Sequence, residues 1–257
     1  MGASTKIILV AIFTAFGAAS YWYGQAQLTV KNINVVLNDY QDFWLWPGNK
    51  IPAAVTLINN LYILQGEFLG NKDHPDLRLT GILPSRLMAK KIWLVFRVER
   101  AVWDGAIAVA VNHRINAWEN QGNNVAGIQI DFDARSSALA DYGNFLREVR
   151  QQLPVEYQLS VTGLLDWSAG AYDSGLANIS QSVDEVIFQT YQGRITIPDY
   201  NRYLQSLTRL NQPFKIGLVE NGDWQPALAH IKALQNNPYF LGFVVFLHNP
   251  NRLEPTK

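Results

Sequence analysis

The 257-residue chain has no cysteine, no excess of charge of either sign, and few histidines. Without cysteine there is no disulfide, no thiolate nucleophile and no thiolate-bound metal. Its 21 basic and 21 acidic residues cancel and form no basic run, which argues against nucleic acid as a partner. The four histidines lack metal-ligand spacing, and no glycine-rich nucleotide loop is found. We therefore expect neither a metal nor an organic cofactor.

Long apolar runs are also scarce, and the one at the N-terminus is typical of an export signal. Lys6 is followed by the uncharged apolar run 7–19, which ends in small residues. Ala26 offers a cleavage site; alternatively a run of about 17 residues is retained as a membrane anchor, at the short limit for spanning. We expect 1–26 to be a signal peptide or anchor. Residues 27–257 would then be exported, in the periplasm or tethered to the inner membrane facing it.

The remaining chain shows no solenoid repeat, low-complexity segment or flexible linker, which indicates one domain. It alternates short apolar runs with helical patterns, and such alternation forms a parallel sheet with right-handed crossovers. Eight units in ~230 residues predict a lean (β/α)8 TIM-type barrel, with a doubly wound open sheet as the alternative. The eight runs are 43–46, 61–67, 92–98, 127–133, 157–165, 185–191, 214–219 and 240–247.

The helices between these runs are uneven in quality. Asp104 is a candidate cap for a helix that buries Ile107, Val111, Ile115 and Trp118. Ser136 or Ser137 is a candidate cap for the next, and Pro198 suits a first helical position. The segment between residues 67 and 92 is broken by prolines, and only about ten residues follow the last run. The eighth helix should therefore be short or missing.

Two carboxylates end the fourth run. Asp131 and Asp133 are two apart, so both leave the same face of a strand, with Cα atoms about 6–7 Å apart. In isolation they would be a helix cap and a solvated strand end. In a barrel, however, catalytic groups stand at the carboxyl ends of strands. Other polar or aromatic candidates for this rim are Gln65, Glu67, Arg97, Glu99, Asp166, Trp167, Gln189, Tyr191, Glu220, Asn221 and His248.

The fourth and fifth runs carry a family resemblance. The residues concerned are Gly127 to Ala134, Tyr142, Phe145-Leu146, Arg150, Leu153-Pro154 and Leu159 to Leu164. They resemble the uncharacterised bacterial family known as domain of unknown function 3142. With the run 43–46, the resemblance extends over most of the mature chain. It implies a barrel but no established chemistry.

The fourth run is also distantly similar to the acidic strand of chitinase-type glycoside hydrolases. In that comparison Ala126, Gln129, Asp131 and Asp133 occupy the four acidic positions, the last being the catalytic glutamate. Gln189-Thr190-Tyr191-Gln192 looks like the Met-Thr-Tyr-Asp of the same enzymes, whose tyrosine contacts the substrate. Two acids are missing and the catalytic one is shortened, which argues against substrate-assisted hydrolysis.

These residues predict a glycoside hydrolase-like site for a polysaccharide or glycan. Of two neighbouring carboxylates, one pKa rises, and Asp133, nearer the rim, would be the general acid while Asp131 orients it. Glu220 would supply the second carboxylate. Predicted substrate contacts are the stacking surfaces Trp46, Trp167 and Tyr191 and the hydrogen-bonding Gln189 and Gln192. The alternatives are an inactive carbohydrate-binding or envelope-assembly barrel and, less favoured, metal-assisted hydrolysis with Asp131 and Asp133 as ligands.

Overall fold

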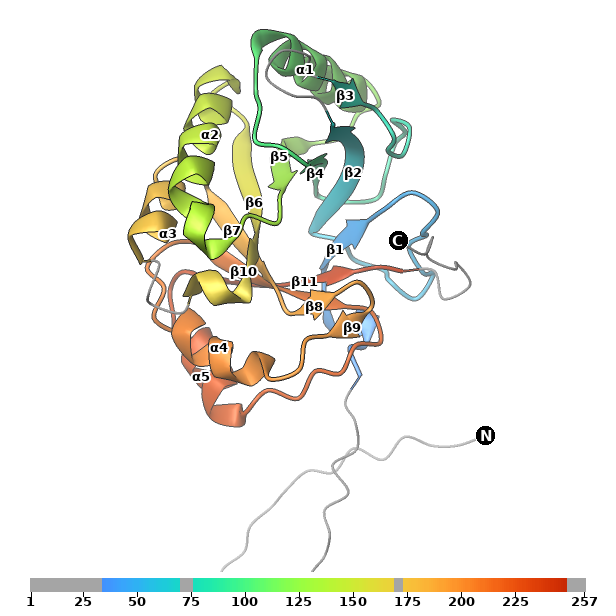
Figure 1. Ribbon diagram of the computed structural model, residues 1–257. Helices are drawn as coiled ribbons and strands as arrows, with labels where there is room; N and C mark the ends of the chain where they lie inside the picture. Colours follow the sequence, from blue (N-terminus) through green and yellow to red (C-terminus); the bar gives the residue numbers. More distant parts are fainter. Residues whose placement is uncertain (1–33, 70–75, 169–172, 249–257) are drawn as a thin grey trace, which may run out of the picture. The chain divides into compact units, whose positions relative to one another are not determined.

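The computed structural model describes residues 34–69, 76–168 and 173–248 (Figure 1). The predicted signal or anchor, and the boundary at residues 26 and 27, lie outside these residues. Within them, no helix combines the length and the apolar character needed to cross a membrane.

Eight parallel strands form a closed barrel. They are β1 (Asp42–Leu45), β2 (Asn60–Phe68), β4 (Lys91–Val98), β5 (Val125–Asp131), β6 (Gln158–Leu164), β7 (Glu185–Gln189), β10 (Phe214–Val219) and β11 (Phe240–Phe246). Their order is β1-β11-β10-β7-β6-β5-β4-β2, and β1 pairs with β2 to close the ring. Each of the eight predicted runs contributes one strand. The TIM-type barrel is confirmed, and closure excludes the open sheet.

The α-helices lie outside the strands, and among the described residues all of them follow β4 in the chain (Figure 1). They are α1 (Gly105–Glu119), α2 (Leu139–Gln152), α3 (Asp173–Ser180), α4 (Tyr200–Leu207) and α5 (Leu228–Gln235). The connections before β2 and before β4 have no helix among their described residues. Prolines interrupt both segments, and the second instead pairs β3 (Leu77–Arg78) antiparallel to β2. Any eighth helix after β11 falls outside the described residues.

Local sequence signals explain how some helices begin. The carboxylate of Asp104 accepts a hydrogen bond from the amide of Ile107 at 2.8 Å, so the predicted cap of α1 is confirmed. The predicted cap of α2 is wrong, because the chain first makes a 3₁₀ turn, η2 (Ser136–Ala138), and the Ser136 hydroxyl donates to Asp166 instead. Pro198 is also not the first helical residue. Asp199 follows it with a φ of 59°, and α4 begins only after that left-handed residue.

The barrel interior is filled by side chains. Its middle layers are apolar and aromatic: Trp44, Tyr62, Leu64, Trp93, Val95, Ile187 and Val244. Trp44 reaches across because Gly217 stands opposite; a Cβ there would lie 2.8 Å from the indole ring. The Trp44 indole N–H donates to Gln129 at 2.6 Å, and the Gln129 amide donates to the Ser160 hydroxyl at 2.9 Å. Since the middle is packed, ligands can enter only at the ends.

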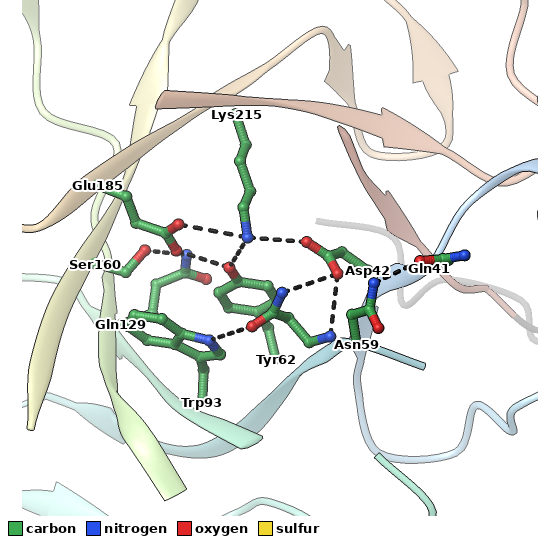
Figure 2. A network of polar contacts seen from close by, with 10 residues as sticks. Gln41, Asp42, Asn59, Tyr62, Trp93, Gln129, Ser160, Glu185 and Lys215 are labelled. Carbon is green, nitrogen blue, oxygen red and sulfur yellow. Dashed lines mark hydrogen bonds and ion pairs between the residues drawn. The ribbon is translucent and has the colours of Figure 1, made fainter. Parts of the chain in front are cut away.

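The amino-terminal end of the barrel is closed by a buried polar network (Figure 2). The Lys215 ammonium donates to Asp42 at 2.9 Å and to the Tyr62 hydroxyl at 2.8 Å, and lies 3.4 Å from Glu185. The Tyr62 hydroxyl donates to Glu185 at 2.7 Å. Burial, and secondarily Glu185, raises the pKa of Tyr62 well above its ordinary value, so the phenol keeps its proton. Every donor of the Lys215 ammonium therefore faces an acceptor in the protein.

Candidate active site at the barrel mouth

The acid pair lies at the opposite end, where β5 leaves the barrel. Side chains alternate along this strand, so Gln129, Asp131 and Asp133 share the inner face. Phe132 points the other way and packs on Tyr142 of α2, with ring centroids 5.1 Å apart. The hydrophobic contact on the outside thus fixes which way the two carboxylates face.

Asp131 is the deeper of the two. It is 9% exposed, and its carboxylate accepts a hydrogen bond from the Thr162 hydroxyl of β6 at 2.9 Å. Burial raises its pKa; Arg97 and the Thr162 bond oppose that shift, and Asp133 adds to it. The sequence predicts that Asp133 is the carboxyl group with the raised pKa. In the structure, burial raises the pKa of Asp131 instead.

Both acids line a cleft of about 640 Å³ that opens at the mouth. Two smaller hollows adjoin it. The first, called here the acidic arm, measures about 460 Å³ and is lined by Glu67, Arg97, Val98, Glu99, Asp131, Phe132 and Asp133. The second, called the basic arm, measures about 450 Å³; its lining includes Trp46, Glu67, Arg97, Arg194, Phe246 and His248. Arg97 lines all three spaces, so they adjoin one another around its side chain.

Strand register explains the central place of Arg97. Parallel pairing sets Arg97 of β4 opposite Asp131 of β5 on one side and opposite Glu67 of β2 on the other. Side chains opposite each other on neighbouring strands share a face and lie in contact range. A cation between two acids therefore spans the rim, and it lowers the cost of placing Asp131 in a buried position.

An aromatic wall faces the acids across the cleft. Tyr191 stacks on Phe246 with ring centroids 5.8 Å apart, and Trp46 meets Phe246 edge-on at 5.3 Å. Burial, then the charges of Asp131 and Asp133, raises the pKa of Tyr191 well above its usual value, so its hydroxyl remains a donor; it is hydrogen-bonded to Gln189. The wall offers flat apolar faces beside hydrogen-bonding groups.

A short hairpin completes this wall. Tyr191 and Gln192 form β8 (Tyr191–Gln192), which pairs antiparallel with β9 (Ile195–Thr196). Just before it, both the amide and the hydroxyl of Thr190 donate to the carbonyl of Gly217, at 3.0 and 2.8 Å. The hairpin is thereby fixed to β10, and Gln192 lines the cleft from it.

Two predicted site residues lie elsewhere. Trp167 is fully buried in the core: its 3₁₀ turn η3 (Leu165–Ser168) tucks the indole under α2, where its N–H donates to the Ala134 carbonyl at 3.0 Å. It presents no face to a sugar. Glu220 lines none of the three spaces, and its carboxylate accepts from the amide of His248 at 3.0 Å.

The cleft also contains Arg97 and Asp166, which the sequence analysis names as rim candidates without a catalytic or substrate-binding role, and Phe246, which it does not name. Asp166 follows β6 and accepts from the Ser136 hydroxyl at 2.5 Å; its other oxygen is buried with no hydrogen-bond partner among the described residues. Its position at the end of the fifth run was a signal for it. In the described part of the chain, no group of three or more His, Asp or Glu is arranged to hold a metal ion.

Comparison with known families gives a match that starts just after β4 and ends just after β10. Residues 99–221 match the family model described as domain of unknown function (DUF3142). The resemblance predicted from the sequence is confirmed over this stretch. It contains Asp131, Asp133, Asp166 and the β8–β9 hairpin, whereas Trp46, Arg97 and Phe246 lie outside the matched residues. The DUF3142 segment thus carries the acids and only part of the aromatic wall.

Among solved structures, the Bacillus cereus spore cortex-lytic enzyme SleL is similar to this chain at 19% identity and a TM-score of 0.38. The similarity covers 63% of this chain and 43% of that one, so the chain spans less than half the length of SleL. No curated protein matches. The barrel assignment rests on the strand pairing itself, and the chemistry rests on the residues of the cleft.

Proposed function

We propose that this protein is a glycoside hydrolase-like enzyme that cleaves a polysaccharide or glycan by carboxylate acid–base chemistry. One observation carries the proposal: Asp131 and Asp133 open into a cleft whose facing wall is aromatic. Flat aromatic faces suit the apolar faces of sugar rings, and amides such as Gln189 and Gln192 suit hydroxyl groups. Carboxylic acids with divergent surroundings are the usual acid and base of glycoside hydrolysis.

Each acid has a proposed role. Asp133, the more accessible, donates a proton to the glycosidic oxygen as the bond from that oxygen to the sugar carbon breaks. Asp131 is a positioning residue, held by the hydrogen bond from Thr162. Asp166 takes the part first assigned to Glu220: it either activates water or attacks the sugar carbon. Carboxyl groups about 5 Å apart give retention, and about 7–9 Å apart give inversion.

The test is the variant Asp133→Asn, which keeps the shape of the side chain but removes the acid. We expect release of reducing ends to be abolished while affinity for the same glycan stays within a few-fold. Asp141→Asn on the exposed face of α2 is the matched control and should keep full activity. If Asp133→Asn kept activity while the protein bound glycan, the acid assignment would be wrong.

A second candidate is a carbohydrate-binding or envelope-assembly barrel that does not cut. It is favoured by Gln129, which stands at an acidic position of the hydrolases but is committed to Trp44 and Ser160. Glycan bound equally by wild type and Asp133→Asn, with no reducing ends from either, would establish it. Metal-assisted hydrolysis is the third candidate function, and loss of activity in the presence of a chelator would support it.

The proposal places the substrate outside the cytoplasm, because residues 1–26 are expected to direct export. Fractionation of cells making the full chain, or a chain lacking 1–26, tests this. Retention of the full chain in the cytoplasm would refute it.

A further inference from the structure

The two arms of the site differ in charge. In the acidic arm, four carboxylates (Glu67, Glu99, Asp131 and Asp133) surround the single cation Arg97. In the basic arm the balance reverses, since Arg97 and Arg194 face one carboxylate, Glu67. A ligand that fills the whole site therefore meets acids at one end and guanidinium groups at the other.

The border between the main cleft and the basic arm is aromatic. Trp46 and Phe246 line both spaces, and their rings meet edge-on at 5.3 Å. A sugar ring lying on this border would have its apolar face on an aromatic surface and a substituent directed into the basic arm. The arm also offers polar side chains, among them Asn49, Thr80 and His248.

We propose that the basic arm is a subsite for an acidic sugar, a ring whose carboxylate is bound by Arg194 together with Arg97. Guanidinium groups bind carboxylates through paired hydrogen bonds with a fixed geometry, which a neutral hydroxymethyl group cannot replace. The inference rests on the proposed function, because it names the substrate class of the same cleft. It narrows the proposed polysaccharide or glycan to a polymer that carries carboxylates.

The position of Arg194 makes the subsite testable without touching the acid pair. Arg194 lies in the turn of the β8–β9 hairpin, whereas Arg97 is in register with Asp131 and influences its pKa. Substitution of Arg97 would disturb both charge recognition and the acids. Arg194→Gln removes the guanidinium group from the turn and leaves Arg97 and the acid pair unchanged, and Arg194→Lys keeps the charge but not the paired hydrogen bonds.

The experiment compares acidic glycans with their own carboxyl-reduced forms, in which a hydroxymethyl group replaces each carboxylate. Oligogalacturonate, oligoalginate and peptide-free peptidoglycan strands are the probes, and titration calorimetry with the full chain gives the affinities. We expect at least one acidic form to bind about tenfold more tightly than its reduced form. Arg194→Gln should bring the two forms close to parity, and Arg194→Lys should fall between. Arg209→Gln, which removes an exposed cation beyond α4, should leave the preference intact.

The outcomes separate the two proposals. Equal binding of acidic and reduced forms, or preference for the reduced form, overturns the anionic subsite and leaves glycan binding in place. A preference for the acidic form that survives Arg194→Gln also overturns it, because the charge would then be recognised elsewhere. If no glycan in either form binds, the proposed function fails and the subsite fails with it.

Discussion

Removal of the Lys215 ammonium should be among the most destabilising single changes in the barrel. Lys215 is 4% exposed, and it is the cation shared by Asp42 and Glu185, which are themselves 8% and 4% exposed. Lys215→Met keeps most of the side-chain volume but leaves two buried carboxylates without their cation. Breaking a buried ion pair in this way costs about 3–5 kcal/mol. For a domain of this size that corresponds to a fall in Tm of roughly 6–20 °C.

The assay is urea and thermal unfolding, followed together by circular dichroism and tryptophan fluorescence. Lys91→Met is the control, because Lys91 is an exposed lysine on β4 at the same end of the barrel, and its loss should cost less than about 0.5 kcal/mol. Adding Asp42→Asn and Glu185→Gln to Lys215→Met should recover much of the lost stability, since no orphaned charge then remains. A cost for Lys215→Met no larger than that for Lys91→Met would refute the reasoning.

Two further changes test the site and the packing. Burial raises the pKa of Asp131 in the folded state. The protonated side chain therefore adds its full contribution to stability at pH values below the ordinary aspartate pKa, and this contribution is lost as the pH rises through the raised pKa. Asp131→Asn should therefore unfold at higher temperature than wild type at neutral pH, with the gain vanishing in acid; a gain that is the same at both pH values would contradict this. Gly217→Ala forces a methyl group against Trp44 and should cost about 1–3 kcal/mol in urea unfolding, whereas Gly105→Ala, with nothing within 4 Å, should not destabilise. Equal effects would show that the Trp44 contact is not tight.

The barrel was predictable because its strands are buried on both faces and therefore appear as unbroken apolar runs. The run at 92–98 became β4 and the run at 214–219 became β10 with little change in bounds. The start of α1 was equally readable, since Asp104 and Ile107 interact within one turn. These features depend on local sequence or on periodicity alone.

The site was predictable only in part, because side-chain neighbours depend on register and on loop paths. Asp131 and Asp133 share a face because side chains alternate along a strand, and this can be predicted from their spacing in the sequence. The row Glu67–Arg97–Asp131 depends on the register of three neighbouring strands, which cannot be predicted from the sequence alone. Trp167 follows a strand end, as a rim residue would, but a 3₁₀ turn directs it into the core.

Closure of the ring by β1 has a consequence for how the protein is made. β1 pairs with β11, and almost the entire described chain separates the two strands in sequence. At a synthesis rate of ~5–20 residues per second, one edge of β1 waits roughly 10–40 s for its partner to emerge. During that time Phe43, Trp44 and Leu45 stand on an open strand edge, the kind of surface that associates with other chains. If the protein needs a chaperone during synthesis, we expect that need to arise at this edge of β1, before β11 has left the ribosome and paired with it.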